Sequence, residues 1–430
     1  MAVRLLLLAN FLKAHRMTRV WLEARSNGQQ MSVRKRTWGD PKAPQTAWIA
    51  DYKDEQGKRR QQSFKLKRDA DEFLQKASVM IREGTFISNN NTETVAQAGA
   101  AWLEKSKSKG LELSTIAQYR QHLEFHIAPF IGSRRLTSLT SRTVREFEDT
   151  LINAGRSGAL TVKVLTSLSS IIADAKERGK VQQNVVLDVK RDRSGAASRL
   201  ARRNKPNLIV GKDVPTPDEI RRFIAVSDQK WRPFFMTAIF TGLRASELRG
   251  LSWRDVDLKK QQLHVRQRAD RYGVIGVPKS AACLRTLPLS SELARELARW
   301  KLVCPRPAAP TMTEDGLGLV FPNGAGNVES LANLINRGLV PLMLKAEIVA
   351  ARDGRAKYTG LHTLRHFYAS FCINRKEDGG LGVNPKLLQK RMGHATIGIT
   401  LDTYSHLFPV EHDPEELEHA ERVLLGTQRM

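Results

Sequence analysis

The stretch RMGHATIGITLDTYSHL, residues 391–407, places His394 at a Gly-His turn and Tyr404 ten positions later. We predict a short helix here, with Tyr404 in its first turn. Thr and Ser accompany the tyrosine, and few large apolar residues lie near it in the sequence. A helical tyrosine is usually a half-buried packing residue, so the rest of the chain decides whether this one has a chemical role.

The composition indicates a folded, strongly basic protein. At 430 residues the chain has room for about three domains of roughly 150 residues each. Lys and Arg number 70 against 44 Asp and Glu, which gives a formal net charge of +26. This excess favours a polyanionic partner, nucleic acid above all, although a basic membrane-surface protein or a ribosome-associated factor has the same charge.

The three cysteines, Cys283, Cys304 and Cys372, are far apart and share no metal-ligand spacing. We therefore expect no disulfide framework, no zinc site and no cofactor. Reduced thiols fit the cytoplasm, where we expect a protein this basic to associate with the nucleoid.

The N-terminal residues do not have the pattern of a membrane segment. Residues 4–12, RLLLLANFL, are too few to span a bilayer, and no small-residue cleavage site follows them. We expect residues 1–30 to be an upstream extension, with translation starting at Met17 or Met31.

Residues 31–70 form a basic segment with 11 Lys and Arg against 5 acids. Alternating apolar residues on either side of DEQGKRR predict a β-hairpin that turns at Gly57, and residues 68–84 predict an amphipathic helix. The basic strands suit a sheet laid against DNA, but a solvated basic face has about equal weight. The candidate DNA-binding residues are Arg34, Lys35, Arg36, Lys58, Arg59, Arg60, Lys65 and Lys67.

Residues 93–185 have the periodicity of several helices, the first of which we predict to stop at Pro129 and Gly132. A basic linker without apolar periodicity follows over residues 186–213. The last domain begins at residue 214. The helical patterns are STIAQYRQHLEFHIAPFIG (114–132), SRTVREFEDTLINAG (141–155) and LTVKVLTSLSSIIADAKERG (160–179).

Side chains that can carry a positive charge recur at candidate functional positions in the last domain. Arg244 lies in the first turn of a predicted helix, and Lys279 lies near the end of a predicted hairpin. Each alone is explained by a surface ion pair or a solvated lysine. His362 and Arg365 are spaced i, i+3, so they share a helical face, and two cations side by side favour an anion between them.

Together with His394 and Tyr404, these residues are what phosphodiester transfer through a protein nucleophile requires. Arginine offers planar, permanently charged donors to the non-bridging oxygens of the transition state. A tyrosine is a suitable nucleophile if its phenol loses a proton during attack. The departing oxygen then needs an acid, such as a lysine on a hairpin.

With these residues placed, the sequence resembles the tyrosine recombinase family, the integrases of phages and mobile elements. The order and spacing of the motifs fit over residues 214–408, and RMGH replaces the commoner LLGH, which we expect to affect packing only. The resemblance implies a multidomain, mainly α protein with small β-sheets. Residues 31–90 resemble the arm-binding module with its three-stranded sheet, and residues 93–185 resemble the helical, SAM-like core-binding domain. The matching motifs are TGLRASEL, PKSAACLRTLPL, HTLRH and RMGHATIGITLDTYSHL.

The resemblance also implies a role for each residue. Arg244, Arg365 and His394 would surround the scissile phosphate. Lys279 would protonate the leaving 5′-oxygen, and Tyr404 would become the 3′-phosphotyrosine.

Three further residues and the tail have supporting roles in this interpretation. His362 would assist proton transfer at the tyrosine or hold the phosphate. Glu247 would be a supporting partner, and Thr400 would cap the helix that presents the nucleophile. The acidic tail, residues 409–430, is expected to form a helix that docks either on a neighbouring subunit or on its own domain.

The function implied is integration or excision of a mobile element by a homotetramer on paired double-stranded DNA sites, without a membrane. An excisionase and a host DNA-bending protein are candidate partners. Alternatives are a chromosome-dimer resolvase or type IB topoisomerase-like enzyme, and a catalytically inactive repressor. The arm-like module argues against the first two, and the intact set of six residues argues against the third.

Overall fold

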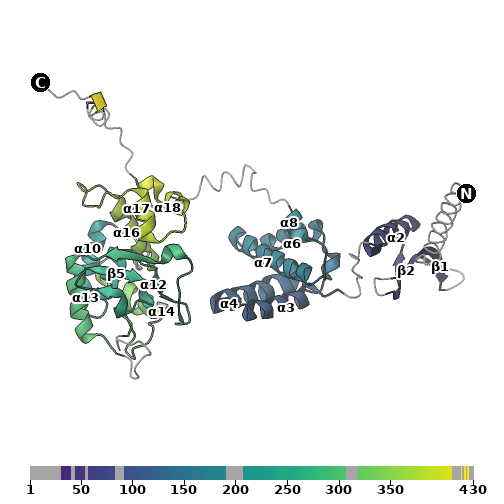
Figure 1. Ribbon diagram of the computed structural model, residues 1–430, viewed down its shortest axis with the longest axis horizontal. Helices are drawn as coiled ribbons and strands as arrows, with labels where there is room; N and C mark the ends of the chain where they lie inside the picture. The colour runs from purple at the N-terminus through teal and green to yellow at the C-terminus, as the bar shows by residue number, and fades with distance from the viewer. Residues whose placement is uncertain are drawn as a thin grey trace, which may run out of the picture. The chain divides into compact units, whose positions relative to one another are not determined.

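The structure is a computed structural model in which the chain divides into two compact units, Met1–Asp192 and Arg193–Met430 (Figure 1). The expected extension over residues 1–30 lies outside the described residues, as do most of the basic linker and most of the acidic tail. The described residues are 31–39, 44–53, 57–82, 92–189, 207–306 and 318–408, with single positions in the tail.

The first unit begins with an antiparallel three-stranded sheet whose strands lie in chain order, with one helix packed on it. Because side chains alternate along a strand, one face of the sheet contributes Ala50 and Tyr52 to a small core beneath that helix. The elements are β1 (Ser32–Trp38), β2 (Gln45–Lys53), β3 (Arg59–Phe64) and α2 (Lys67–Arg82).

The same alternation divides the predicted basic residues between the two faces. Lys35 pairs with Trp48, which packs against the helix-side core. Arg34 and Arg59 lie on the opposite face around buried Asp51, whose Oδ2 is 3.7 Å from Arg34 Nη2 and 2.5 Å from Arg59 Nη2. The predicted DNA-binding residues therefore do not form a single face.

Helices α3 to α8 form the rest of the first unit around one apolar core. The helical segment ends before Gly132, as predicted, but it does not stop at Pro129, because a turn of π-helix precedes the proline and the chain continues helically to Ile131. In that turn the Ala128 N–H bonds to the Leu123 carbonyl; the proline, which lacks an N–H, follows directly. The elements are α3 (Val95–Ser108), α4 (Leu113–Gln121), η2 (His122–Ile127), α5 (Ala128–Ile131), η3 (Leu136–Ser138), α6 (Ser141–Asn153), α7 (Gly158–Glu177) and α8 (Val185–Asp188).

Among the described helices, α7 has the length and composition to cross a membrane. Nine of its residues are buried in the helical core. We identify it as the core helix of this unit, since core helices of soluble domains share those properties.

The second unit contains helices around α11, with a small sheet of order β4-β5-β8 and a separate β6-β7 hairpin. Its helices are α10 (Pro217–Val226), α11 (Arg232–Thr241), α12 (Ala245–Arg249), α13 (Ser291–Val303), α14 (Leu331–Asn333), η6 (Leu334–Leu339), α15 (Val340–Lys345), α16 (His362–Ile373), α17 (Pro385–Met392) and α18 (Ile397–Tyr404), followed by η7 (Ser405–Leu407). Its strands and short turns are η4 (Trp253–Asp255), β4 (Val256–Asp257), β5 (Gln262–Val265), β6 (Arg268–Ala269), β7 (Ile275–Gly276), η5 (Ala281–Cys283) and β8 (Arg285–Pro288).

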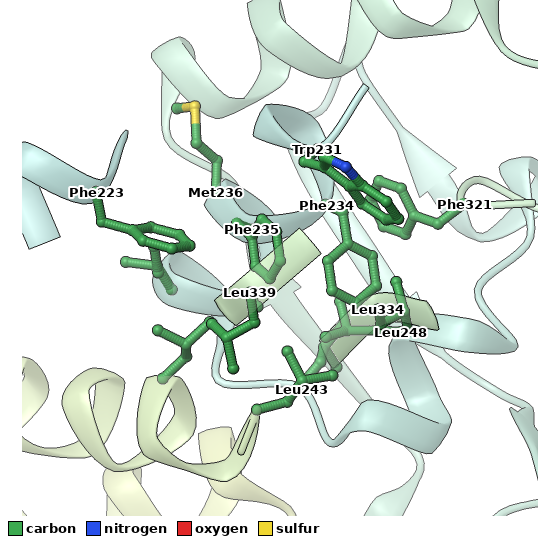
Figure 2. Close-up of a cluster of buried hydrophobic side chains, with 14 of the residues drawn as sticks. Phe223, Trp231, Phe234, Phe235, Met236, Leu243, Leu248, Phe321, Leu334 and Leu339 are labelled. Atoms are coloured by element: carbon green, nitrogen blue, oxygen red, sulfur yellow. The ribbon is translucent and has the colours of Figure 1, made fainter. Parts of the chain in front are cut away.

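The core of the second unit fixes the position of α11 (Figure 2). Eight of its ten residues are buried, and Phe234 packs edge to face against both Phe235 and Phe321. A helix that is apolar on all sides is buried and packs against neighbouring elements on every side. Its C-terminal end, from which Arg244 emerges, is therefore held firmly.

Candidate active site

A glycine turn at the end of α11 delivers Arg244 to the site. Gly242 has φ +61° and caps the helix in the left-handed conformation, which glycine adopts without steric cost. A Cβ on it would lie 2.3 Å from Tyr368 Cδ1. Arg244 then becomes the N-cap of α12, with one third of its side chain exposed.

A second glycine turn, at the end of α17, delivers His394. Gly393 has φ +62°, and a Cβ there would lie 2.8 Å from Arg285 Nη1. Its carbonyl accepts a hydrogen bond from Arg244 Nη2 at 2.9 Å. The two turns, distant in sequence, are thus joined through the arginine.

Arg365 on α16 also joins the turns after α11 and α17. Its guanidinium is buried and donates to the carbonyls of Gly242 and Met392, each at 2.5 Å. Burial, followed by the charge of Arg244, lowers the pKa of Arg365 to about 10. Two cations held together at this depth favour a bound anion between them.

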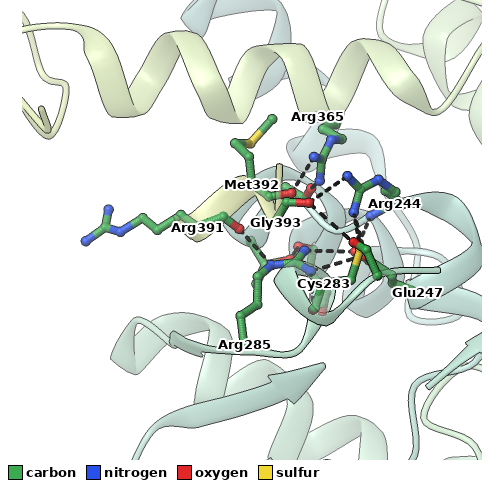
Figure 3. A network of polar contacts seen from close by, with 12 residues as sticks. Arg244, Glu247, Cys283, Arg285, Arg365, Arg391, Met392 and Gly393 are labelled. Carbon is green, nitrogen blue, oxygen red and sulfur yellow. Dashed lines mark hydrogen bonds and ion pairs between the residues drawn. The ribbon is translucent and has the colours of Figure 1, made fainter. Parts of the chain in front are cut away.

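Glu247 connects the arginines in the network of Figure 3. Its carboxylate accepts from Arg244 Nη1 at 2.8 Å and pairs with both terminal nitrogens of Arg285, at 3.1 and 2.8 Å. Burial acts to raise the pKa of Glu247, but Arg285 and Arg244 outweigh it and hold the pKa below its ordinary value. Arg285 was missed from the sequence, where its signal was an arginine within the apolar strand LRTLPL.

Replacing Glu247 with Gln should lower the free energy of unfolding by on the order of 3 kcal/mol at pH 7, since it leaves the buried Arg285 and the partly exposed Arg244 without their counter-charge. The folded-state pKa lies below the ordinary 4.5, so the carboxylate stabilises the fold above that pH and loses this effect as pH falls through the folded-state value. Denaturant titrations at pH 7 and at pH 3 to 4 should show the difference between the two proteins shrinking in acid. A constant difference would contradict an ionised Glu247.

Tyr404 lies close enough to Arg365 and Arg244 for both charges to act on its phenol. It is the last residue of α18, so the predicted place in a first turn is wrong. Its side chain is almost completely buried, and its ring is parallel to that of His394 with centroids 6.4 Å apart. Burial raises the pKa of Tyr404 to about 12, against the opposing charges of Arg365 and Arg244.

Thr400 does not cap this helix. The N-cap of α18 is Thr396, and Thr400 is buried one turn before the tyrosine. Its Oγ1 lies 2.9 Å from His394 Nδ1, so it orients the imidazole. Burial, followed by the nearby arginines, lowers the pKa of His394 to about 4, so the ring is neutral at pH 7.

A histidine that sequence reasoning missed contacts the phenol directly. His366 Nδ1 lies 2.9 Å from Tyr404 Oη. The ring of His362 is exposed and packs edge to face on that of His366, with centroids 4.6 Å apart. The signal in the sequence was the second histidine of HTLRH, four residues after the first and therefore on the same helical face.

Lys279 is exposed, on the segment between β7 and η5. The hairpin strand β7 ends at Gly276, and the chain then forms η5, which carries Cys283 into the site with its Sγ 3.5 Å from Arg244 Nη1. Lys279 thus lies just beyond the β6-β7 hairpin, on the segment that leads to Cys283.

The arrangement suits a phosphodiester and a nucleophile supplied by the protein. Two guanidinium groups can hold non-bridging oxygens, and a buried phenol lies beside them with a neutral imidazole in hydrogen-bond range. Of the six predicted residues, Arg244, His362, Arg365, His394 and Tyr404 lie within electrostatic range of one another. The sixth, Lys279, is on the adjoining exposed segment.

Comparison with known proteins gives matches to both units. The phage integrase family model matches residues 214–411, and the model of the phage integrase N-terminal SAM-like domain matches residues 94–152. The SAM-like model covers part of the helical core of the first unit, and the integrase model covers nearly all of the described residues of the second unit.

Two relatives are similar over most of their length. The ICEBs1 integrase of Bacillus subtilis is 23% identical over 313 residues, 69% of this chain and 76% of the relative. A XerC-like tyrosine recombinase of Caldanaerobacter subterraneus subsp. tengcongensis is 23% identical over 380 residues, 83% and 90% of the two chains.

Among solved structures, the Tn1549 transposon integrase in complex with transposon right end DNA superimposes with a TM-score of 0.57. It is 21% identical, and the match covers 77% of this chain and 99% of that one. At this identity the likeness shows the shared fold.

Proposed function

Because this chain belongs to the phage integrase family of tyrosine recombinases, we propose that its active site is formed by Arg244, Arg365, His394 and Tyr404. The protein is a site-specific DNA recombinase that cleaves and rejoins DNA to integrate or excise a mobile element. The observation that supports this site most strongly is the burial of the Tyr404 phenol within electrostatic range of Arg244 and Arg365, whose guanidinium groups hydrogen-bond to the turns after α11 and α17.

In this mechanism the scissile phosphate binds between the guanidinium groups of Arg244 and Arg365. Tyr404 Oη attacks phosphorus, the bond to the 5′-oxygen breaks, and a 3′-phosphotyrosine forms. Arg244 and Arg365 stabilise the extra charge on the non-bridging oxygens. The exposed ring of His362 lies beside them and holds the phosphate. Rejoining is the reverse reaction and needs neither ATP nor metal, since the phosphotyrosine keeps the bond energy.

A nicked duplex that loses the leaving strand tests this proposal. The wild-type protein should form a detergent-stable protein-DNA adduct, and peptide mapping should place the DNA on Tyr404. An adduct on any other residue, or no adduct on any cognate site, would overturn the assigned site.

Lys279 is proposed as the acid that protonates the leaving 5′-oxygen. Lys279→Ala should slow cleavage by about 10²–10⁴-fold, the usual range for losing an acid catalyst. A substrate with sulfur in place of that oxygen needs little protonation, so single-turnover cleavage of it should be equal in both proteins. A defect that persists with sulfur would remove the lysine from this role.

We also propose a division of labour along the chain. Residues 31–90 bind accessory arm DNA, residues 93–185 bind the core site, and residues 214–408 carry the chemistry. The assembly on DNA is a homotetramer, assisted by an excisionase and a host DNA-bending protein, in the cytoplasm at the nucleoid. The net charge of +26 and the exposed basic side chains around Asp51 support DNA contact by the first unit.

A further inference from the structure

We propose that His366 is the group that takes the proton from Tyr404 during attack and returns it during rejoining, an inference that rests on the proposed function. The geometry supports it directly: of the histidines around the phenol, His366 is the one whose ring nitrogen lies in hydrogen-bond range of Oη, at 2.9 Å. His394 is oriented instead towards Thr400. The assignment moves the base from the first histidine of HTLRH to the second.

The protonation states fit this direction of transfer. Burial, then His362 and Arg365, lowers the pKa of His366 to about 4, against the opposing charge of Asp213. The imidazole is therefore neutral at pH 7, and in the tautomer that carries its proton on Nε2, Nδ1 accepts a hydrogen bond from the Tyr404 hydroxyl. A phosphate bound by Arg365 adds negative charge beside the ring and makes the imidazolium easier to form.

The proton balance is complete without another reactant. As Tyr404 Oη bonds to phosphorus, its proton passes to His366 Nδ1, and the leaving 5′-oxygen takes a proton from the proposed acid, Lys279. In rejoining, the 5′-hydroxyl gives its proton to the Lys279 amine as its oxygen attacks phosphorus, and the departing tyrosine oxygen regains its proton from the His366 imidazolium. The same residue thus acts in both directions, as microscopic reversibility requires.

His366→Asn separates proton transfer from positioning. The asparagine amide oxygen occupies nearly the place of Nδ1 and still accepts a hydrogen bond, but it takes up no proton. We expect single-turnover cleavage to fall by about 10²–10⁴-fold, with the Kd for DNA unchanged. Sulfur at the leaving position should not restore the rate, in contrast to Lys279→Ala.

The matched control is His406→Asn, since that ring lies two residues after Tyr404 and its Nε2 bonds to the Leu208 carbonyl. We expect it to cleave within about twofold of wild type, because it does not contact the phenol. Cleavage by His366→Asn at a similar rate would show that the ring only positions the tyrosine or that another base acts, and would overturn the inference.

A second measurement keeps the test decisive if His366→Asn is less stable. Fluorinated tyrosine at position 404 has a more acidic phenol and depends less on a base. In the His366→Asn protein it should therefore raise the cleavage rate by at least about tenfold. Absence of any rescue in folded protein would contradict a proton-transfer defect. A wild-type adduct on Tyr404 with full activity in His366→Asn would refute this inference alone, whereas no wild-type adduct would refute the proposed function.

Discussion

Tyr404→Phe should bind the recombination site as tightly as wild type and form no covalent adduct. The substitution removes one oxygen from a ring that is almost completely buried, so the packing against Met392 and Tyr368 is retained. Cleavage should fall by at least about 10⁴-fold, as expected when a nucleophile is deleted. A filter-binding titration measures the first quantity, and denaturing gels on a nicked duplex measure the second.

The stability of this variant separates chemistry from folding. Losing the hydroxyl leaves His366 Nδ1 without its partner at 2.9 Å, at a cost of about 1 kcal/mol. Thermal unfolding should therefore show a small decrease, too small to explain the loss of cleavage. A persistent adduct in Tyr404→Phe would move the nucleophile elsewhere.

Sequence reasoning was successful where function depends on local motifs. TGLR and the Gly-His turn each need a glycine with positive φ, and such turns are visible in the sequence because few other residues adopt them. The similarity of the motifs to those of tyrosine recombinases led to the correct family. The helical periodicity of residues 93–185 likewise predicted the helices of the first unit.

The errors arose where tertiary contacts determine the role of a residue. Thr400 looked like a cap because Thr is favoured there, but the helix begins earlier and its hydroxyl is used by His394. Arg285 does lie in a strand, β8, but its role was missed because only folding brings it to Glu247, 38 positions away. His366 contacts Tyr404 across the same separation of 38 residues, which helical spacing alone does not encode.

Arg365→Lys should impair both catalysis and folding. A lysine ammonium is a single centre, so it does not reproduce the fork that donates to the carbonyls of Gly242 and Met392. One buried carbonyl loses its partner, which costs about 1–3 kcal/mol. Loss of the planar donor to the phosphate should slow cleavage by a further 10²–10³-fold, the approximate effect of removing one donor to a developing oxyanion.

The two effects are separated by measuring cleavage well below the unfolding midpoint of the variant and by changing the substrate. A methylphosphonate at the scissile position carries one negative charge less, so the missing guanidinium matters less and the gap between variant and wild type should narrow by at least tenfold. Arg299→Lys is the control, since this side chain is 66% exposed and lies in surface ion pairs on α13; its effect should stay below about 0.5 kcal/mol. If the gap for Arg365→Lys is equally wide with both substrates, the arginine acts only by joining the two turns, and the phosphate must be held by Arg244 and the histidines.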